Sequence, residues 1–349
     1  MRNALAALLL AAWGFAALAP PGALAVQTNA GVGGAQFLRL GAGARALAMG
    51  EAYGPVAEGP EAIYWNPAGL AQLKEPAFSY THSELLQFFH YDFTAYAQPV
   101  AALKGTLAAS YTRLSQNNMP LVTKSNVEVG SFAPHSDAVA LAYAGAFALT
   151  GTVARDRDYF KDTWNLPMAD RPLAEEGELW AGNLMLGLSL KALDETYYDR
   201  SASAFAVDGG ALFRPEGRSE LALSFSFRNA GTPERFIHDA QKLPAEAGFG
   251  AAYGLRWGEA RLLPAFELAL PYYGSPYAKF GVEFSKTVAE NTSVALRAGY
   301  TSEPAIDLSP LTGLTTGVGV TYKRFSTDFG FEPMAALGEV YRLSLGLSW

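Results

Sequence analysis

The chain has 349 residues, of which half are hydrophobic and 17% are charged, with a net charge of −7 and no cysteine. The negative charge argues against a nucleic-acid partner, and without cysteine the fold has no disulfide bonds. About 25% of the residues of an ordinary soluble domain are charged, so this chain needs either a large apolar core or a lipid-facing surface. Four histidines without cysteine argue against a structural zinc site, and we predict neither a metal nor another cofactor.

The first 25 residues have the pattern of a secretion signal. Arg2 supplies a positive start, an apolar stretch covers 4–19, and Ala23-Leu24-Ala25 offers the small residues that a signal peptidase reads. The apolar stretch is shorter than the roughly 20 residues with which a helix crosses a bilayer. We therefore predict a signal peptide over 1–25, which is removed after Sec-type export.

Residues 26–74 show little alternation and are rich in alanine, glycine and turn-forming residues. Examples are Gly41-Ala42-Gly43-Ala44-Arg45 and Asn66-Pro67-Ala68-Gly69. Such residues suit a segment packed inside another structure, where backbones approach closely. The glycines at 41 and 43 imitate a dinucleotide-binding fingerprint, but no buried strand precedes them, and we set that interpretation aside.

Downstream of this segment, apolar and polar side chains alternate with a period of two. That period gives a strand one face in an apolar medium and the other in a wet one. The runs are about ten residues long, as a tilted strand needs to cross a bilayer. We count fourteen, at 76–83, 88–99, 104–114, 137–147, 183–193, 202–213, 219–229, 246–256, 261–270, 277–288, 292–301, 314–323, 325–333 and 339–349. The sequence predicts an all-β fold, a transmembrane antiparallel β-barrel over 75–349, with both ends on the periplasmic side.

Charged residues lie in the middle of several runs, on the face opposite to the apolar one. They are Lys191, Arg228, Arg256, Lys279, Arg297, Lys323 and Arg342, against Asp92, Asp208, Glu267, Glu283, Asp328 and Glu332. A charge costs roughly 2–4 kcal/mol at the bilayer midplane, so we expect these side chains to face the lumen. Among them we single out Asp208, Arg228, Glu283 and Arg297, which should contact the N-terminal segment or one another. The near balance of signs favours paired charges in a partly filled lumen over a wide ion-selective pore.

Several features fall at the expected ends of strands. We expect Leu85, Leu86, Phe88 and Phe89 to form an apolar loop at the extracellular rim, and His82 and His90 to be strand-end residues. Tyr197, Tyr198, Tyr272, Tyr273 and Tyr277 suit an interfacial aromatic girdle, with an apolar entry site as the alternative. Residues 148–182 form a long polar stretch on the side of the short turns. A periplasmic insertion and a miscounted hairpin both remain open for it. Three aspartates in it, at 156, 158 and 162, lack the glycine and glutamate that complete a calcium loop.

The last run ends on an aromatic residue with no tail after it. Its apolar positions are Tyr341, Leu343, Leu345, Leu347 and Trp349, and small or polar residues separate them. We predict that these five residues are the insertion signal, recognised by the barrel-insertion machinery.

The residues 37–53 and the stretch Tyr64-Trp65-Asn66-Pro67-Ala68-Gly69-Leu70 resemble the opening of the PorV/PorQ family, within the FadL-like superfamily of hydrophobic-compound transporters. Matches at 188–191, 205–212, 227–233 and 296–300 extend the resemblance toward Trp349. It implies a fourteen-stranded barrel whose N-terminal segment, 26–74, folds into the lumen as a hatch that carries Arg45, Asn66, Pro67, Ala68 and Gly69. Residues 148–182 depart from the family pattern, because they are longer and more charged than it leads us to expect.

The sequence shows no catalytic constellation, so we expect a protein that is not an enzyme, in the cell outer membrane of a diderm bacterium. The resemblance implies passive transport of hydrophobic small molecules. The alternatives are a type IX-like protein-secretion component of the PorV type and a structural envelope barrel. The expected partners are outer-membrane lipid, the barrel-insertion machinery, and either hydrophobic ligands or secreted client proteins.

Overall fold

The computed structural model describes residues 33–85, 88–154, 176–215, 220–236, 239–303, 310–334 and 338–349. The expected signal peptide, 1–25, lies outside the described residues. Within the described part of the chain, no helix combines the length and the apolar character needed to span a bilayer.

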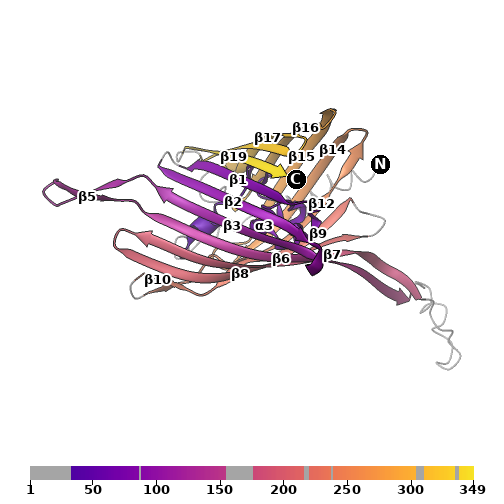
Figure 1. Cartoon of the computed structure of the whole chain (residues 1–349), viewed down its shortest axis with the longest axis horizontal. Coiled ribbons are helices and arrows are strands. Elements are labelled where there is room, and N and C mark those ends of the chain that lie inside the picture. The colour runs from indigo at the N-terminus through magenta and orange to yellow at the C-terminus, as the bar shows by residue number, and fades with distance from the viewer. Residues whose placement is uncertain are drawn as a thin grey trace, which may run out of the picture.

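Fourteen antiparallel strands close into a barrel, which confirms the predicted fold (Figure 1). They are β1 Ala77–Leu85, β2 Phe89–Val100, β3 Gly105–Gln116, β6 His135–Ala154, β7 Glu176–Tyr197, β8 Arg200–Pro215, β9 Leu221–Gly231, β12 Glu246–Tyr253 with its continuation β13 Leu255–Trp257, β14 Ala260–Pro271, β15 Tyr277–Ala289, β16 Thr292–Thr301, β17 Leu314–Tyr322, β18 Phe325–Pro333 and β19 Glu339–Ser348. The first strand pairs with the last, from Ala77↔Ser348 to Glu84↔Tyr341, and this pairing closes the ring.

The alternation in the sequence separates the two faces of the barrel wall. On β7, Leu186, Leu188 and Leu190 point outward and are exposed. Ser189 and Lys191, which alternate with them, are buried. A closed sheet pairs its backbone groups internally, which is what a structure inside hydrocarbon requires. Apolar side chains therefore form the outer surface, and small, polar and charged side chains form the lumen.

Two hairpins extend beyond the barrel at opposite ends (Figure 1). Between β3 and β6, the strands β4 Met119–Val122 and β5 Glu128–Phe132 form a separate two-stranded sheet. At the other end, β6 and β7 continue to pair as far as Ala154↔Glu176. The residues 148–154 and 176–182 thus extend an existing hairpin at the end of the barrel where the C-terminus lies, and 155–175 fall outside the described residues.

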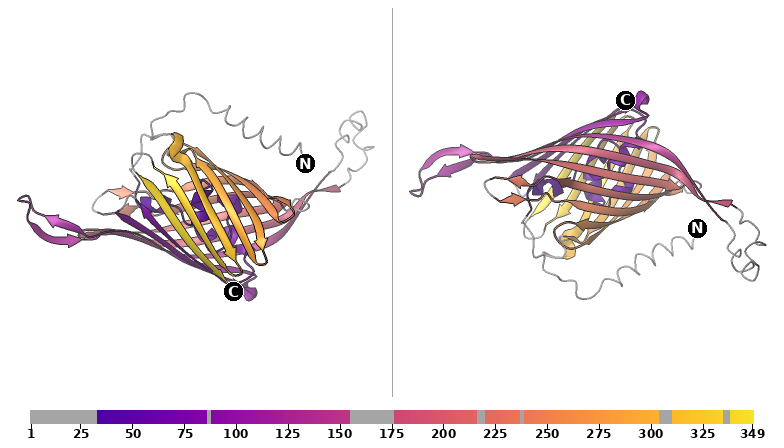
Figure 2. Two further views of the ribbon diagram at one scale, coloured as in Figure 1. Left: turned by 90° about the horizontal axis from the view of Figure 1, so that it is seen from above. Right: turned by 90° about the horizontal axis from the view of Figure 1, so that it is seen from below.

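Residues 33–74, the described part of the expected hatch, lie inside the barrel (Figure 2). They form short helical turns, namely η1 Gln36–Arg39, α2 Ala44–Ala48, η2 Gly54–Val56, α3 Ala62–Trp65 and η3 Pro67–Gln72. Below we call residues 33–74 the hatch. α2 contacts β16–β19, η2 contacts β9, β12 and β14, and η3 contacts β3 and β6–β8. The hatch therefore touches strands on all sides of the lumen. Three further short elements lie in the described part of the chain: η4 Ala101–Leu103, η6 Pro310–Gly313, and the sheet of β10 Glu234–Arg235 with β11 Ala240–Gln241.

Candidate functional site in the barrel lumen

Inward-facing glycines of four neighbouring strands make a floor for α2. They are Gly281 on β15, Gly299 on β16, Gly317 on β17 and Gly330 on β18. The first two face each other across one strand pair and the last two across another. A Cβ atom added to Gly281 would lie 2.5 Å from the carbonyl oxygen of Met49, and one added to Gly330 would lie 2.8 Å from that of Ala44. A Cβ at these positions would collide with the hatch, with its backbone at Gly281, Gly299 and Gly330 and with the Ala48 Cβ at Gly317, so we call these four residues the glycine floor.

Backbone amides at the start of α2 and just after it are hydrogen-bonded to β19 and β17. The amide of Ala44 donates to Ser344 Oγ at 2.8 Å, and the amide of Gly50 donates to Thr315 Oγ1 at 3.0 Å. The Ser344 hydroxyl thus satisfies an amide that the first turn of α2 leaves unpaired, and the Thr315 hydroxyl adds a second acceptor to the Gly50 amide, which also donates to the Leu47 carbonyl at 3.0 Å.

A second close approach holds η3 at the opposite wall. Gly187 of β7 and Gly210 of β8 face each other, and a Cβ at either would overlap Pro67 or Asn66. The Asn66 side chain accepts a hydrogen bond from the amide of Ala68 at 3.1 Å and donates to the carbonyl of Ala211 at 3.3 Å. Asn66 therefore caps η3 and also ties it to β8, and Pro67, Ala68 and Gly69 beside it are buried.

A continuous series of ion pairs links the hatch to the barrel wall. Arg45 binds Glu283 through two hydrogen bonds, at 2.7 and 3.1 Å, and also pairs with Glu58. Glu283 accepts a third hydrogen bond, at 2.7 Å, from Arg297, which binds Asp328 at 2.7 Å. Positive and negative groups alternate along this series of ion pairs, and the alternation neutralises charges that are largely withdrawn from water.

Cations of the wall also face the aromatic cluster of the hatch. Tyr64 and Trp65 pack edge to face, with ring centroids 5.0 Å apart. The guanidinium of Arg228 lies 4.9 Å from the Trp65 ring centroid, and Lys279 Nζ lies 5.5 Å from it. Arg228 pairs with Glu246, and Lys279 Nζ lies 3.7 Å from Glu246 Oε1. These contacts are cation–π interactions in a site with little water, where such interactions are strongest.

A bulge in β9 places Arg228 under the hatch. Asn229 has a φ of 57° and, together with Arg228, stands opposite the single residue Asp208 of β8. Its amide donates to Asp208 Oδ1 at 2.7 Å, and Asp208 Oδ2 lies 2.6 Å from Lys191 Nζ. Lys191 also donates to Asn229 Oδ1 at 2.9 Å. A buried ion pair therefore fixes the bulge, a feature that commonly redirects side chains in sheets.

The two ends of the lumen differ in chemistry. At the end opposite the C-terminus, Phe37 and Leu38 of η1 pack against an apolar wall of Ala138, Leu193, Ala204, Ala206 and Leu243. At the C-terminal end lies a cavity of about 200 Å³, whose lining combines apolar side chains such as Phe78, Phe325 and Leu345 with the charged side chains of Arg45, Glu58, Glu61, Lys323, Arg324 and Asp328. Burial and the nearby charge of Asp328 raise the pKa of Glu61 in the hatch to about 7.

The expected rim loop divides between two environments. Leu85 is buried and Phe89 packs against the same core, whereas Phe88 is 59% exposed. Leu86 lies outside the described residues. Only Phe88, among the described members, presents an apolar surface to the mouth of the barrel.

The residues expected to form the insertion signal all lie on the last strand or directly after it. Tyr341, Leu343 and Leu345 are exposed on the outer face of β19, and Leu347 shares their face. Trp349 stacks on Tyr96 of β2 with ring centroids 5.9 Å apart. These side chains belong to the apolar outer belt at the seam where β19 meets β1.

Two expectations about side-chain direction are wrong. Asp92 faces outward, because its neighbours Tyr91 and Phe93 are the buried residues of β2. Near the end of a strand both faces are wet, so a charge there does not mark the lumen. Tyr277 is buried in the lumen beside Glu246 instead of joining the aromatic girdle, whereas Tyr197, Tyr198 and Tyr272 are exposed.

The alternation of apolar and polar residues did not predict the glycine floor. Its signal was present: Gly281 and Gly299 lie at positions of the same parity as the lumen charges Glu283 and Arg297. Glycine inside a strand pattern indicates a bulge or a close backbone approach. That rule, applied to the inward face, would have marked β15 and β16 as strands that another backbone approaches, without showing which hatch residues approach them.

Comparisons with known proteins give structural likeness only. No family model and no curated protein matches the chain. The toluene transporter TodX of Pseudomonas putida has 9% identity and a TM-score of 0.47, covering 88% of this chain and 96% of its own. The Ralstonia pickettii toluene transporter TbuX has 13% identity and a TM-score of 0.37, covering 88% and 97%. A Pseudomonas aeruginosa FadL homologue has 10% identity and a TM-score of 0.46, covering 87% and 97%. At these values the likenesses identify neither a family nor a substrate.

Proposed function

We propose that this chain is an outer-membrane barrel through which hydrophobic small molecules pass, and that the hatch controls their passage. The observation that carries the proposal is the position of the hatch, between an apolar cluster at one mouth and a cavity with a mixed charged and apolar lining at the other. The apolar outer face of the closed barrel supports a location in a bilayer, and antiparallel barrels of this kind suit the outer membrane.

The contacts of the hatch suit a part that moves. η1 meets the wall through apolar side chains and the ion pair of Arg39 with Glu303. α2 packs on the glycine floor, and its hydrogen bonds and ion pairs with the wall are contacts that water can replace. An apolar molecule that enters beside Phe37 and Leu38 would compete with η1 for its apolar surroundings. Displacement of η1 and α2 would then open a path toward the cavity at the C-terminal end.

The test compares apolar and polar solutes in whole cells, whose lipopolysaccharide slows the entry of both. Expression of the protein should speed the entry of N-phenylnaphthylamine, a dye that fluoresces in phospholipid, and leave the entry of lactose unchanged relative to cells without the protein. Equal acceleration of both solutes would indicate an open porin, and acceleration of neither would refute transport.

One feature favours a second candidate, a protein-secretion component of the PorV type. The β4–β5 hairpin stands clear of the barrel and exposes Val122, Val127 and Val129. Exposed apolar side chains on a projecting hairpin suit contact with another protein. Deletion of 119–132 would then abolish surface delivery of a client protein encoded nearby and leave dye entry unchanged. If the transport proposal alone holds, delivery of such proteins does not depend on the hairpin.

A further inference from the structure

Charged and imidazole side chains gather on the outer face of the barrel, at the loop end of β1 and β2. Toward the C-terminal end, this face carries the exposed aromatic residues Phe78 and Tyr96. Toward the loop, it carries His82, Glu84, His90 and Asp92. Charged side chains on the lipid face are destabilising at the midplane of a bilayer and cost little near its surface. The group therefore lies at or beyond the headgroup level, within reach of water.

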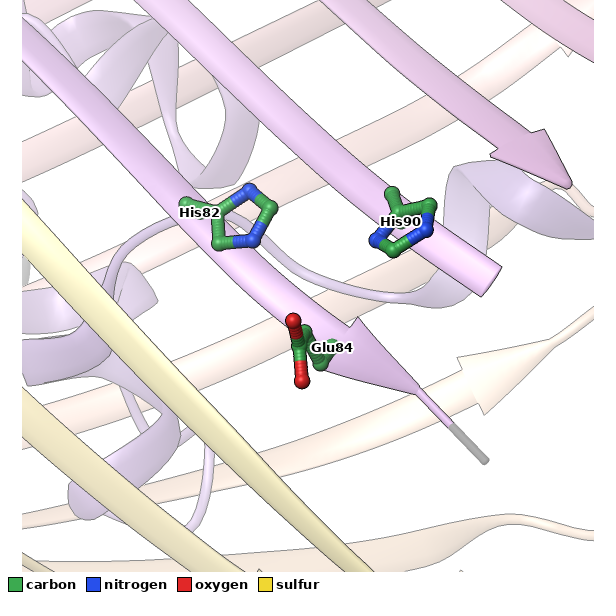
Figure 3. Close-up of side chains that lie close together, drawn as sticks. All are labelled: His82, Glu84 and His90. Carbon is green, nitrogen blue, oxygen red and sulfur yellow. The ribbon is translucent and has the colours of Figure 1, made fainter. Parts of the chain in front are cut away.

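The strand register brings three of these side chains together. Glu84 stands opposite His90, and His82 stands opposite Asp92. The rings of His82 and His90 stack with centroids 6.3 Å apart and planes inclined by 17°. One ligand atom each of His82, Glu84 and His90 lies within 4.8 Å of the other two (Figure 3). The sequence alone suggested two separate strand-end histidines, because it does not show which residue of β2 faces Glu84.

A fourth residue orients one of the imidazoles. His82 Nδ1 lies 2.8 Å from Asp92 Oδ1, which also accepts a hydrogen bond from the Tyr80 hydroxyl at 2.6 Å. This leaves Nε2 of His82 as its free ligand atom. A carboxylate bound to the far nitrogen of a histidine is the usual support of a metal-binding imidazole.

We propose that His82, Glu84 and His90 bind a divalent transition-metal ion such as Zn²⁺. Two imidazoles and one carboxylate form the donor set of zinc sites that keep a fourth position open for water or another ligand. Zinc bonds of about 2.0–2.1 Å place tetrahedral ligand atoms roughly 3.3 Å apart, so atoms that lie within 4.8 Å of one another need to close by at most about 1.5 Å. Side-chain rotation supplies that movement, since Glu84 is exposed and the His82 side chain is 39% exposed.

The bound ion would cross-link β1 to β2 next to the loop that carries Phe88. It would thereby restrain the mouth of the barrel from outside, through residues that the hatch does not touch. The proposal is independent of what passes through the lumen.

Titration calorimetry of the untagged full-length barrel with Zn²⁺ tests the proposal, because a polyhistidine tag would itself bind the ion. We expect one saturable site. H82A and H90A should each raise its Kd at least tenfold, and D92N should raise it about tenfold through the lost support of His82. H135A, which removes a nearby histidine on β6 outside the cluster, should leave the Kd within twofold.

A spectroscopic measurement on the unaltered protein keeps the test independent of folding. The electron paramagnetic resonance spectrum of bound Cu²⁺ should show coupling to two imidazole nitrogens, and to one in H82A. The absence of a saturable site, equal effects of H82A and H135A, or a spectrum without two coupled nitrogens would each overturn the proposal.

Discussion

Gly281→Ala is the most selective perturbation of the hatch that the structure offers. The added Cβ would lie 2.5 Å from the Met49 carbonyl oxygen, 2.9 Å from its Cβ and 3.1 Å from its carbonyl carbon, whereas ordinary contacts begin near 3.4 Å. The nearest of these atoms is backbone, so no side-chain rotation relieves the clash. Overpacking of this kind costs typically about 1–3 kcal/mol. If that cost falls on docking of α2, the undocked fraction rises roughly 5- to 150-fold, since every 1.4 kcal/mol is a factor of ten.

Entry of N-phenylnaphthylamine into whole cells measures this change, with protease access to the hatch as a second readout. Gly145→Ala is the matched control, because a Cβ on Gly145 would find its nearest neighbour at 3.4 Å. Both variants should insert normally, and only Gly281→Ala should speed dye entry and expose the hatch. Identical dye entry and protease resistance in the two variants would refute the reasoning that the glycine floor positions the hatch.

Three further outcomes follow from other parts of the structure. Deletion of Trp349, or its change to Asp, should leave the chain in the periplasm and open to degradation; a normal heat-modifiable barrel in outer-membrane fractions would contradict this. Asp208→Asn removes one partner of a buried ion pair and should cost about 3 kcal/mol, which lowers the temperature at which the folded band converts to the unfolded band on a gel. Asp199→Asn, at an exposed turn, should not lower it. The raised pKa of Glu61 means that docking is favoured most below the ordinary glutamate pKa and loses this contribution as the pH rises through about 7. Protease access to the hatch should therefore increase between pH 5 and pH 8, and Glu61→Gln should flatten that profile.

The alternation of apolar and polar residues predicted the strands correctly, because each strand of the barrel separates an apolar medium from a polar interior. The same alternation assigned Lys279, Glu283 and Arg297 to one face, since a misplaced register would put all of them into lipid. The alternation does not predict the direction of a charged side chain at a strand end, because both faces meet water there. Asp92 was therefore assigned to the wrong face. Tyr277 is two residues before Lys279 on the same strand, so the alternation placed its side chain in the lumen. Its residue type instead suggested the aromatic girdle.

The path of the hatch was beyond local sequence reasoning. Its turns are too short for a helical period, and its contacts join residues far apart in the chain, such as Gly54 with Glu267 and Ala44 with Ser344. Composition indicated dense packing inside something else, but it did not show which wall each turn would face. The bulge at Asn229 was equally hidden, because its cause is a buried contact with Asp208 on the neighbouring strand.

The most direct test of hatch control is the ion conductance of single barrels in a planar bilayer, before and after deletion of residues 31–49. This deletion removes η1 and α2 and leaves every strand intact. We predict that the deleted form inserts as a heat-modifiable barrel and conducts at least about ten times more current than the intact protein, because water then fills the lumen above the cavity. A deleted form that inserts normally and conducts no more than the intact protein would contradict the claim that the hatch closes the barrel.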